Sequence, residues 1–172
     1  MGFETTGLDQ LKLKLQRLAG IPELANDALR QCADELRDRA RDMAPIDYGD
    51  LIAAIQIRRL GAQGAGGRFV KGVSTFEVFV NNETPVKDPD KLRHGVDKVG
   101  EYAWMVHEHM GWASQPNPEF MPSEQSVLHG QARHAEAGGK FLERAAAELK
   151  AKFEERLAQI VLKRIQNLDF QA

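Results

Sequence analysis

Apolar residues recur at helical spacing in three stretches of the chain. Over 8–18, four leucines (Leu8, Leu11, Leu15 and Leu18) lie three, four and three residues apart, which places them on one face of a helix, although Leu13 breaks the pattern. From Pro22 to Ala44 an apolar stripe lies opposite residues of alternating charge, and Pro45 ends this second helix because the residue before a proline disfavours the α region. From about 140 to 168 there is no Gly or Pro, so the apolar stripe predicts one helix of ~43 Å.

Two shorter stretches alternate apolar and polar residues, as strands do. After a turn at 47–50 and a short apolar helix through Leu51, the alternation of Ile55 and Ile57 with polar neighbours predicts the start of a strand. A clearer strand follows over 74–80. One face of it carries Phe76, Val78 and Val80, and the other carries Thr75, Glu77 and Phe79.

The connection between these strands, about 61–73, is rich in glycine, with five glycines among residues 61–72. This composition predicts a long, mobile hairpin loop, and loops of such length usually carry function. Polar, proline-containing segments over about 82–97 and 112–138 predict irregular structure, with a marginal helix after Pro122. Between these two segments, residues 99–110 follow helical spacing, although their aromatic and β-branched content leaves a strand open.

These elements together predict an α+β fold. We expect a small antiparallel sheet with a long hairpin loop, packed against two to three helices that include the long C-terminal one. The 172 residues are enough for a single domain over 1–172, in which roughly 70% of the unfolded chain's surface becomes buried.

Charge and composition exclude several classes of protein. The chain has 23 basic and 25 acidic side chains, and a net charge of −2 provides no overall basic field for nucleic acid. No apolar run approaches the ~20 residues that cross a bilayer, and the N-terminus shows no signal peptide, so we expect no membrane partner. The single cysteine, Cys32, lies on an apolar helical stripe and is expected to be a buried small hydrophobe.

Catalytic and metal-binding patterns are weak. His107 and His109 flank Glu108, but this spacing is not the i, i+4 pair of helical zinc sites. No nucleophile motif, phosphate-binding glycine motif or carboxylate pair is evident, so we expect no enzyme activity, no metal and no cofactor. A small metal-dependent hydrolase that uses His107, His109 and a carboxylate stays open as an alternative.

The glycine-rich loop is the one locally basic element. We expect it to be a docking surface for a partner subunit. Transient contact with DNA phosphates is an alternative role for the loop, and a nucleic-acid-binding module is an alternative function for the whole chain. Two tryptophans outside the loop also belong to the predicted subunit interface, because large amphipathic residues are enriched at interfaces. The candidate subunit interface comprises Arg58, Arg59, Arg68, Phe69, Val70, Lys71, Trp104 and Trp112.

Three motifs, in this order, resemble one protein family. Residues 44–51 read Ala-Pro-Ile-Asp-Tyr-Gly-Asp-Leu, similar to a family signature that continues to an isoleucine, here Ile55. The other two are Tyr-Ala-x-x-Val followed by a glutamate, and Phe-Leu-x-x-Ala at the start of the last helix. The motif residues are Pro45, Gly49, Leu51, Tyr102, Ala103, Glu108, Phe141 and Leu142. Over roughly 5–160 the chain resembles the tail-component family of long-tailed bacteriophages, which are neck, tail-completion and head–tail joining proteins.

The resemblance implies a non-enzymatic structural protein of the virion, made in the cytoplasm of the bacterial host. Such a connector would form a homo-oligomeric ring, of six or twelve subunits, that joins the head to the tail. Its partners would be portal or head-closure proteins on one side and tail-tube or tail-terminator proteins on the other. A tail terminator or a minor capsid component of the same virion is the alternative.

Overall fold

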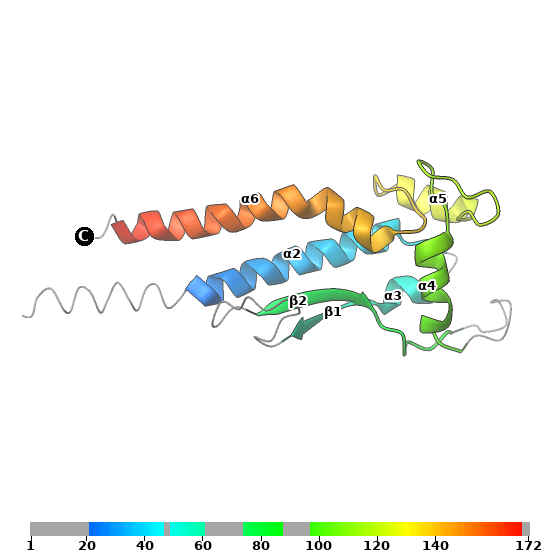
Figure 1. Cartoon of the computed structure of the whole chain (residues 1–172), viewed down its shortest axis with the longest axis horizontal. Helices are drawn as coiled ribbons and strands as arrows, with labels where there is room; N and C mark the ends of the chain where they lie inside the picture. Colours follow the sequence, from blue (N-terminus) through cyan, green and yellow to red (C-terminus); the bar gives the residue numbers. More distant parts are fainter. Residues whose placement is uncertain (1–20, 47–48, 61–73, 88–96, 170–172) are drawn as a thin grey trace, which may run out of the picture. The chain divides into compact units, whose positions relative to one another are not determined.

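The computed structural model describes residues 21–46, 49–60, 74–87 and 97–169 (Figure 1). Within them, five helices and one two-stranded sheet follow the order α2, α3, β1, β2, α4, α5, α6. This arrangement confirms the predicted α+β class with its long C-terminal helix. The helix predicted over 8–18 and the loop predicted over 61–73 lie outside the described residues.

Internal contacts divide the chain into two compact units. One comprises 1–32, 59–76 and 151–172, and the other comprises 33–58 and 77–150, which we call the larger unit. The core, the exposed face of α4 and the pocket described below all belong to the larger unit. That residues 1–172 form a single domain stays a prediction.

Helix α2 (Ile21–Met43) confirms the predicted helix between Pro22 and Ala44. Pro22 lies in its first turn, where the missing N–H costs nothing, and Glu23 beside it complements the helix dipole. The helix ends where the amide of Ala44 donates to the carbonyl of Ala40 at 2.9 Å, directly before Pro45. The buried members of its stripe are small or flexible: Ala28, Cys32, Ala33, Ala40 and Met43.

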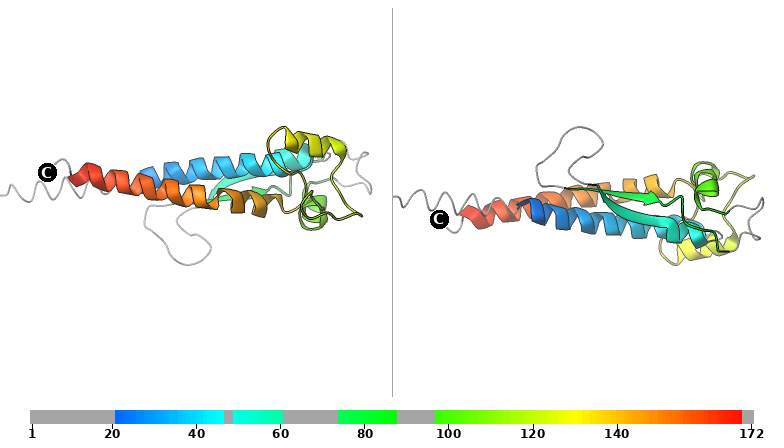
Figure 2. Two further views of the ribbon diagram at one scale, coloured as in Figure 1. Left: turned by 90° about the horizontal axis from the view of Figure 1, so that it is seen from above. Right: turned by 90° about the horizontal axis from the view of Figure 1, so that it is seen from below.

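Helix α3 (Gly49–Ala54) leads directly into strand β1 (Ile55–Leu60), which pairs with β2 (Thr75–Val80); Figure 2 shows the two strands side by side. The amide of Asn81 donates to the carbonyl of Ala54 at 2.7 Å at the base of this hairpin. The strands thus begin and end close to the predicted positions.

The two faces of the sheet have different surroundings. Ile55 is fully buried, and Val78 and Val80 pack against the core, as the alternation of apolar residues predicted. Arg58 and Glu77 face each other across the strands, with Arg58 largely exposed. The inner face of the sheet is therefore apolar, whereas the outer face carries an ion pair.

Helix α4 (Gly100–His109) settles the ambiguity over 99–110 in favour of a helix. Its buried residues, Tyr102, Ala103 and Val106, follow i, i+1, i+4 spacing on one side. Helix α5 (Glu124–Gln131) occupies the place of the marginal helix expected after Pro122, and the hydroxyl of Ser123 caps it by accepting from the amide of Ser126 at 3.2 Å.

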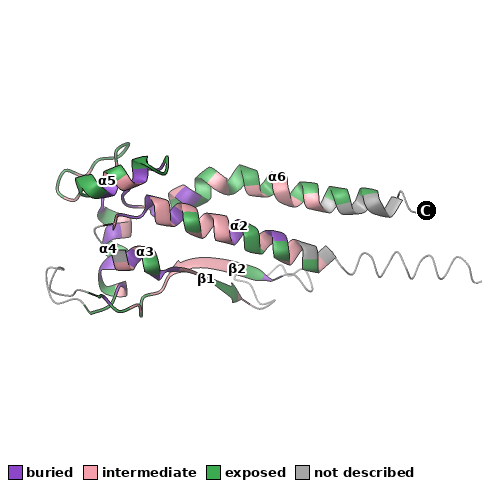
Figure 3. Cartoon of the chain, turned by 180° about the vertical axis from the view of Figure 1, so that it is seen from behind, coloured by how far each residue is buried: buried purple, intermediate pink, exposed green. Residues whose placement is uncertain are grey.

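Helix α6 (Phe141–Asp169) closely matches the predicted range of 140–168. In Figure 3 its first turns contain buried positions, while the turns that follow, as far as their burial is described, are coloured as intermediate or exposed. Phe141 and Ala145 are completely buried and belong to the core of the larger unit. The core also includes Ala40, Met43, Ala44, Leu51, Ala54, Ile55, Val86, Val99, Tyr102, Ala103, Val106, Met110 and Ala135.

The segment Gly138–Lys140, directly before α6, is hydrogen-bonded to two other helices. The amide of Gly138 donates to the carbonyl of Met43 at the end of α2 (2.9 Å), and the amide of Lys140 donates to the carbonyl of His107 in α4 (2.6 Å). Gly138 has a φ of +148° and Lys140 a φ of +53°. A Cβ on Gly139 would lie 2.2 Å from a backbone carbonyl oxygen, so only glycine permits this close approach.

None of the helices, as far as the structure describes them, is long and apolar enough to span a bilayer.

Candidate functional site

Two of the predicted interface arginines, Arg58 and Arg59 in β1, make contacts within the chain. The Nε of Arg58 lies 2.6 Å from Oε2 of Glu77, and its guanidinium stacks 4.6 Å from the centre of the Phe79 ring. The Nε of Arg59 donates to the hydroxyl of Ser74 at 2.8 Å. The other four members of the predicted loop surface, Arg68, Phe69, Val70 and Lys71, lie outside the described residues.

The side of α4 opposite its core residues carries two large apolar side chains in solvent. Trp104 is 66% exposed and Met105 is 51% exposed. The Trp104 ring meets the His109 ring edge-on at 4.9 Å, and Glu101, one turn earlier, is also exposed. Apolar side chains of this size gathered on one exposed face are typical of an interaction surface.

Trp112, the other predicted interface tryptophan, is partly buried. The guanidinium of Arg144, the fourth residue of α6, lies 4.8 Å from the centre of its ring. This cation–π contact joins the loop after α4 to α6 within the larger unit. The structure therefore does not bring Trp104 and Trp112 into a common cluster of described contacts.

Six of the motif residues lie in or against the core. Pro45, Leu51 and Phe141 are fully buried, Tyr102 and Ala103 are nearly so, and Leu142 packs against the cluster. Gly49 is the first residue of α3. Glu108 instead takes part in an ion-pair cluster. Because six of the eight motif residues are core residues, most of the motif specifies how the core packs.

This ion-pair cluster was missed by sequence reasoning and joins α4 to α6. The Nδ1 of His107 lies 2.9 Å from Oε1 of Glu108, and its Nε2 lies 2.7 Å from Oε2 of Glu143. The ammonium of Lys140 contacts Glu108 and lies 3.8 Å from Oε1 of Glu143. The ring of His107 also packs edge-on against Phe141 at 4.8 Å. Partners so distant along the chain left no signal in local spacing.

The electrostatics of this cluster are those of an ion-pair network. The hydrogen bond from Lys140, and secondly that from His107, holds the pKa of Glu108 below its ordinary value of 4.5. The same hydrogen bond to Glu108 raises the pKa of Lys140. One imidazole and two carboxylates, with ligand atoms within 4.8 Å of one another, could in principle hold a metal ion. The Lys140 ammonium, however, already supplies the positive charge beside both carboxylates, and His109 faces Trp104 instead.

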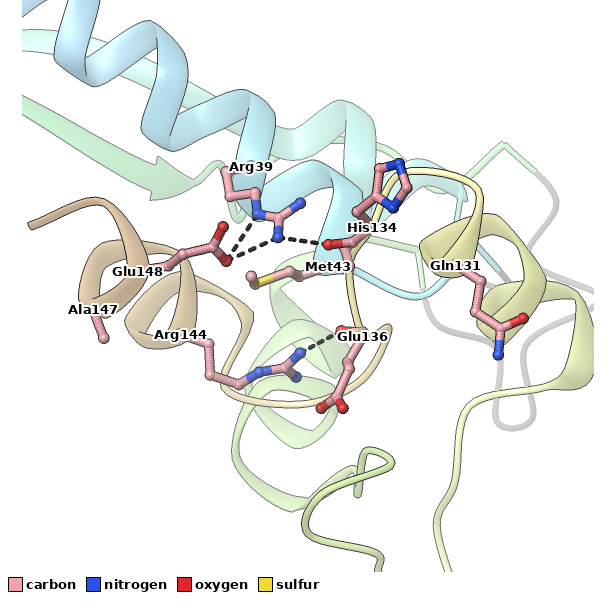
Figure 4. Close-up of a pocket in the computed structure, with 9 residues that line it drawn as sticks. Arg39, Met43, Gln131, His134, Glu136, Arg144, Ala147 and Glu148 are labelled. Atoms are coloured by element: carbon pink, nitrogen blue, oxygen red, sulfur yellow. Dashed lines mark hydrogen bonds and ion pairs between the residues drawn. The ribbon is translucent and has the colours of Figure 1, made fainter. Parts of the chain in front are cut away.

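A pocket of about 560 Å³ opens between the end of α2, the loop after α5 and the first turns of α6 (Figure 4). Arg39 spans one side of it: its Nε and Nη2 donate to Oε2 of Glu148 at 3.0 and 2.9 Å, and Nη2 also donates to the carbonyl of His134 at 2.7 Å. Arg144 donates to the carbonyls of Gly139, at 2.8 Å, and Glu136. The other lining residues are Met43, Gln131, Ala135 and Ala147.

Burial governs the charge on this pocket. Desolvation lowers the pKa of Arg144, with the neighbouring charge of Arg39 acting in the same direction, while Glu136 and Glu148 oppose them. The two guanidinium groups are held by carbonyl oxygens as well as by one carboxylate. The pocket thus combines apolar side chains with two fixed cationic groups and has no constellation typical of acid–base or nucleophilic catalysis among its lining residues.

Comparison with known proteins identifies the family. Neither the curated proteins nor the solved structures with which the chain was compared match it. A family model described as "Bacteriophage HK97-gp10, putative tail-component" matches residues 9–103. The matched residues are more than half of the 172 and contain the first motif, β1, β2 and the start of α4. The chain therefore belongs to the HK97-gp10-like family of bacteriophage tail components.

Proposed function

We propose that this tail component is a neck or tail-completion subunit that forms a ring between the head and the tail of the virion. In this role it would contact portal or head-closure proteins on one side and tail-tube or tail-terminator proteins on the other. DNA passing through the lumen of the ring would be contacted at most transiently. The observation that carries the proposal is the family match over 9–103, together with the order of the three motifs.

The surface of the larger unit supports a structural role. Ring subunits need apolar groups that become buried on assembly, and Trp104 and Met105 are such groups on α4. The charged groups that resemble a catalytic or metal site, around His107 and Glu108, instead lie within ion-pair distance of one another and of Lys140. A non-enzymatic function fits this distribution.

The predicted loop surface remains part of this proposal. Arg68, Phe69, Val70 and Lys71 provide two cations and two apolar side chains between the strands. Replacing 61–73 by a two-residue Asn-Gly turn, which suits an antiparallel hairpin, should leave a soluble subunit that assembles poorly. Normal assembly of this variant would remove the loop from the interface.

The direct test is to inactivate the gene in its phage and to examine the lysate by electron microscopy. A neck or tail-completion subunit is required after head filling and tail growth, so DNA-filled heads and separate tails of normal length should accumulate. A tail terminator would instead leave tails of uncontrolled length, and a minor capsid component would leave defective heads. Intact, infectious particles would contradict the proposal.

A second measurement addresses the ring itself. Native mass spectrometry of the purified chain, or of neck complexes released from virions, should give a closed oligomer of six or twelve copies of the 19.2 kDa subunit. A different closed number would correct the stoichiometry, and absence of the chain from purified virions would overturn the function.

A further inference from the structure

Two arginines tie the C-terminal end of α5 to α2, within the larger unit. Arg39, in α2, donates from Nη1 to the carbonyl of Arg133 at 3.1 Å and from Nη2 to the carbonyl of His134 at 2.7 Å, shortly after the end of α5. In the other direction, Nε of Arg133 lies 3.3 Å from Oδ1 of Asp42, in the last turn of α2. The contacts of Arg39 reach uncharged carbonyls and do not titrate, whereas the contact with Asp42 depends on how the Arg133 side chain is held.

The Arg133 side chain is held by His129, in the last turn of α5. Its Nη1 lies 3.0 Å from Nδ1 of the His129 ring and donates to the His129 backbone carbonyl at 3.3 Å. A guanidinium group has only N–H donors and stays charged in proteins. Nδ1 must therefore accept the hydrogen bond, which requires a neutral imidazole with its proton on Nε2.

The charges around His129 also favour the neutral ring. Burial, and secondly the charge of Arg133, hold the pKa of His129 below its ordinary value of 6.5, while Asp42 acts in the opposite direction. The C-terminal end of a helix usually favours a cation. Here, however, the carbonyls of His129 and Arg133 already accept from the guanidinium groups of Arg133 and Arg39. His129 is therefore neutral at about pH 7 and becomes charged only in mildly acidic solution.

Protonation of Nδ1 would remove the acceptor and place a second cation beside the guanidinium of Arg133. The Arg133 side chain is 47% exposed, so it can turn into solvent and leave Asp42. We propose that His129 is an acid-sensitive latch, which orients Arg133 towards Asp42 when it is neutral and loosens α5 from α2 when it is protonated. The contacts of Arg39 remain in both states, so α5 is loosened rather than released. This inference goes beyond the proposed ring function and does not depend on it.

The direction of the pH effect follows from the lowered pKa of His129. Because the folded state disfavours the charged ring, the contribution of His129 to stability is fully present above 6.5 and is lost as pH falls through the lowered value. The contribution of Glu108, in contrast, is fully present above 4.5 and is lost only at more acidic pH. The two effects therefore occupy different pH ranges and can be measured separately.

Nuclear magnetic resonance of the full chain with isotopically labelled histidine tests the geometry directly. At about pH 8 the His129 ring should carry its proton on Nε2, and its protonation midpoint should lie below 6.5. Arg133→Met removes the donor and the charge from an exposed position, so the midpoint of His129 should rise towards 6.5. A proton on Nδ1 of the neutral ring, or a midpoint that does not respond to Arg133→Met, would overturn the latch.

Hydrogen exchange tests whether the latch acts on α5. After correction for the intrinsic exchange rates, protection of the α5 amides should fall at least about threefold from about pH 7.5 to about pH 5, relative to the rest of the larger unit. His129→Gln keeps a side-chain acceptor for Arg133 that does not titrate in this range, so this response should disappear. Unchanged protection of wild-type α5 would contradict the proposal.

His134→Gln is the matched control, because it removes an exposed histidine from the same loop. This variant should keep the pH response of wild type, since the contact with Arg39 uses the backbone carbonyl of residue 134. If His129→Gln keeps the response as well, or His134→Gln abolishes it, His129 is not the latch. These outcomes leave the ring function untouched, because that function is tested by the particles that accumulate without the gene.

Discussion

The two halves of α6 are one continuous helix, yet they are stabilised differently. In the first half, 141–150, Phe141 and Ala145 are completely buried and Arg144 bonds to two backbone carbonyls. In the second half, 151–169, every residue whose exposure is described is intermediate or exposed. This half is stabilised by the helix propensity of its residues and by local contacts, such as the hydrogen bond from Gln159 to Glu155 one turn earlier. Tertiary packing thus anchors the helix at one end, and local sequence extends it.

The largest expected effect is at the anchored end. Phe141→Ala should lower the free energy of unfolding by about 3–5 kcal/mol, because it leaves a cavity in the core and removes the contact with His107. Phe153→Ala, in the second half, removes the same ring from a partly buried position and should cost about 1 kcal/mol. Denaturant unfolding of both variants measures the difference. Equal losses would mean that both halves are anchored alike.

The glycine before α6 tests how closely that end is packed. Gly139→Ala would place a Cβ 2.2 Å from the carbonyl oxygen of Met110, so the junction with α4 must shift. We expect a loss of about 1–3 kcal/mol, visible as a lower melting temperature. An unchanged melting temperature would show that α6 can move away from α4 at little cost.

The ion-pair cluster should make the anchored end sensitive to acid. The pKa of Glu108 is lowered in the folded state, so its contribution to stability is present above 4.5 and is lost as pH falls through the lowered value. Glu108→Gln should therefore destabilise the protein at about pH 7, and its difference from wild type should shrink towards about pH 3. Glu154→Gln, at an exposed position of the second half, serves as the control. A difference that does not change with pH would remove the ion pair as its cause.

The smallest effect on stability is expected in the exposed second half of α6. Leu162 is 57% exposed in the second half of α6, and Leu162→Ala should change the free energy of unfolding by no more than about 0.5 kcal/mol. A clear loss of stability, or a change in oligomer size at unchanged stability, would show that this half is covered by something outside the described contacts.

The periodicity of the sequence was enough to place α2, α6 and the two strands, but it left 99–110 open between a helix and a strand. The apolar stripe over 22–44 and Pro45 correctly predicted where α2 ends, and the absence of Gly and Pro correctly predicted the extent of α6. The alternation over 74–80 correctly predicted which face of β2 packs against the core. These features depend on neighbours three or four residues apart, or two apart in a strand, so they can be recognised without knowing the fold. The family resemblance rested on the same local motifs, and most of those residues proved to be core residues.

Tertiary structure alone decided which distant side chains meet. Lys140 reaches Glu108 across 32 positions, and Arg39 reaches Glu148 across 109. Sequence reasoning found Trp104 as an interface candidate because of its chemistry, but it could not find the pocket, whose lining residues come from α2, α6 and the loop after α5. The physical reason is that spacing within one element fixes a face, whereas the contact between two elements depends on how their cores pack.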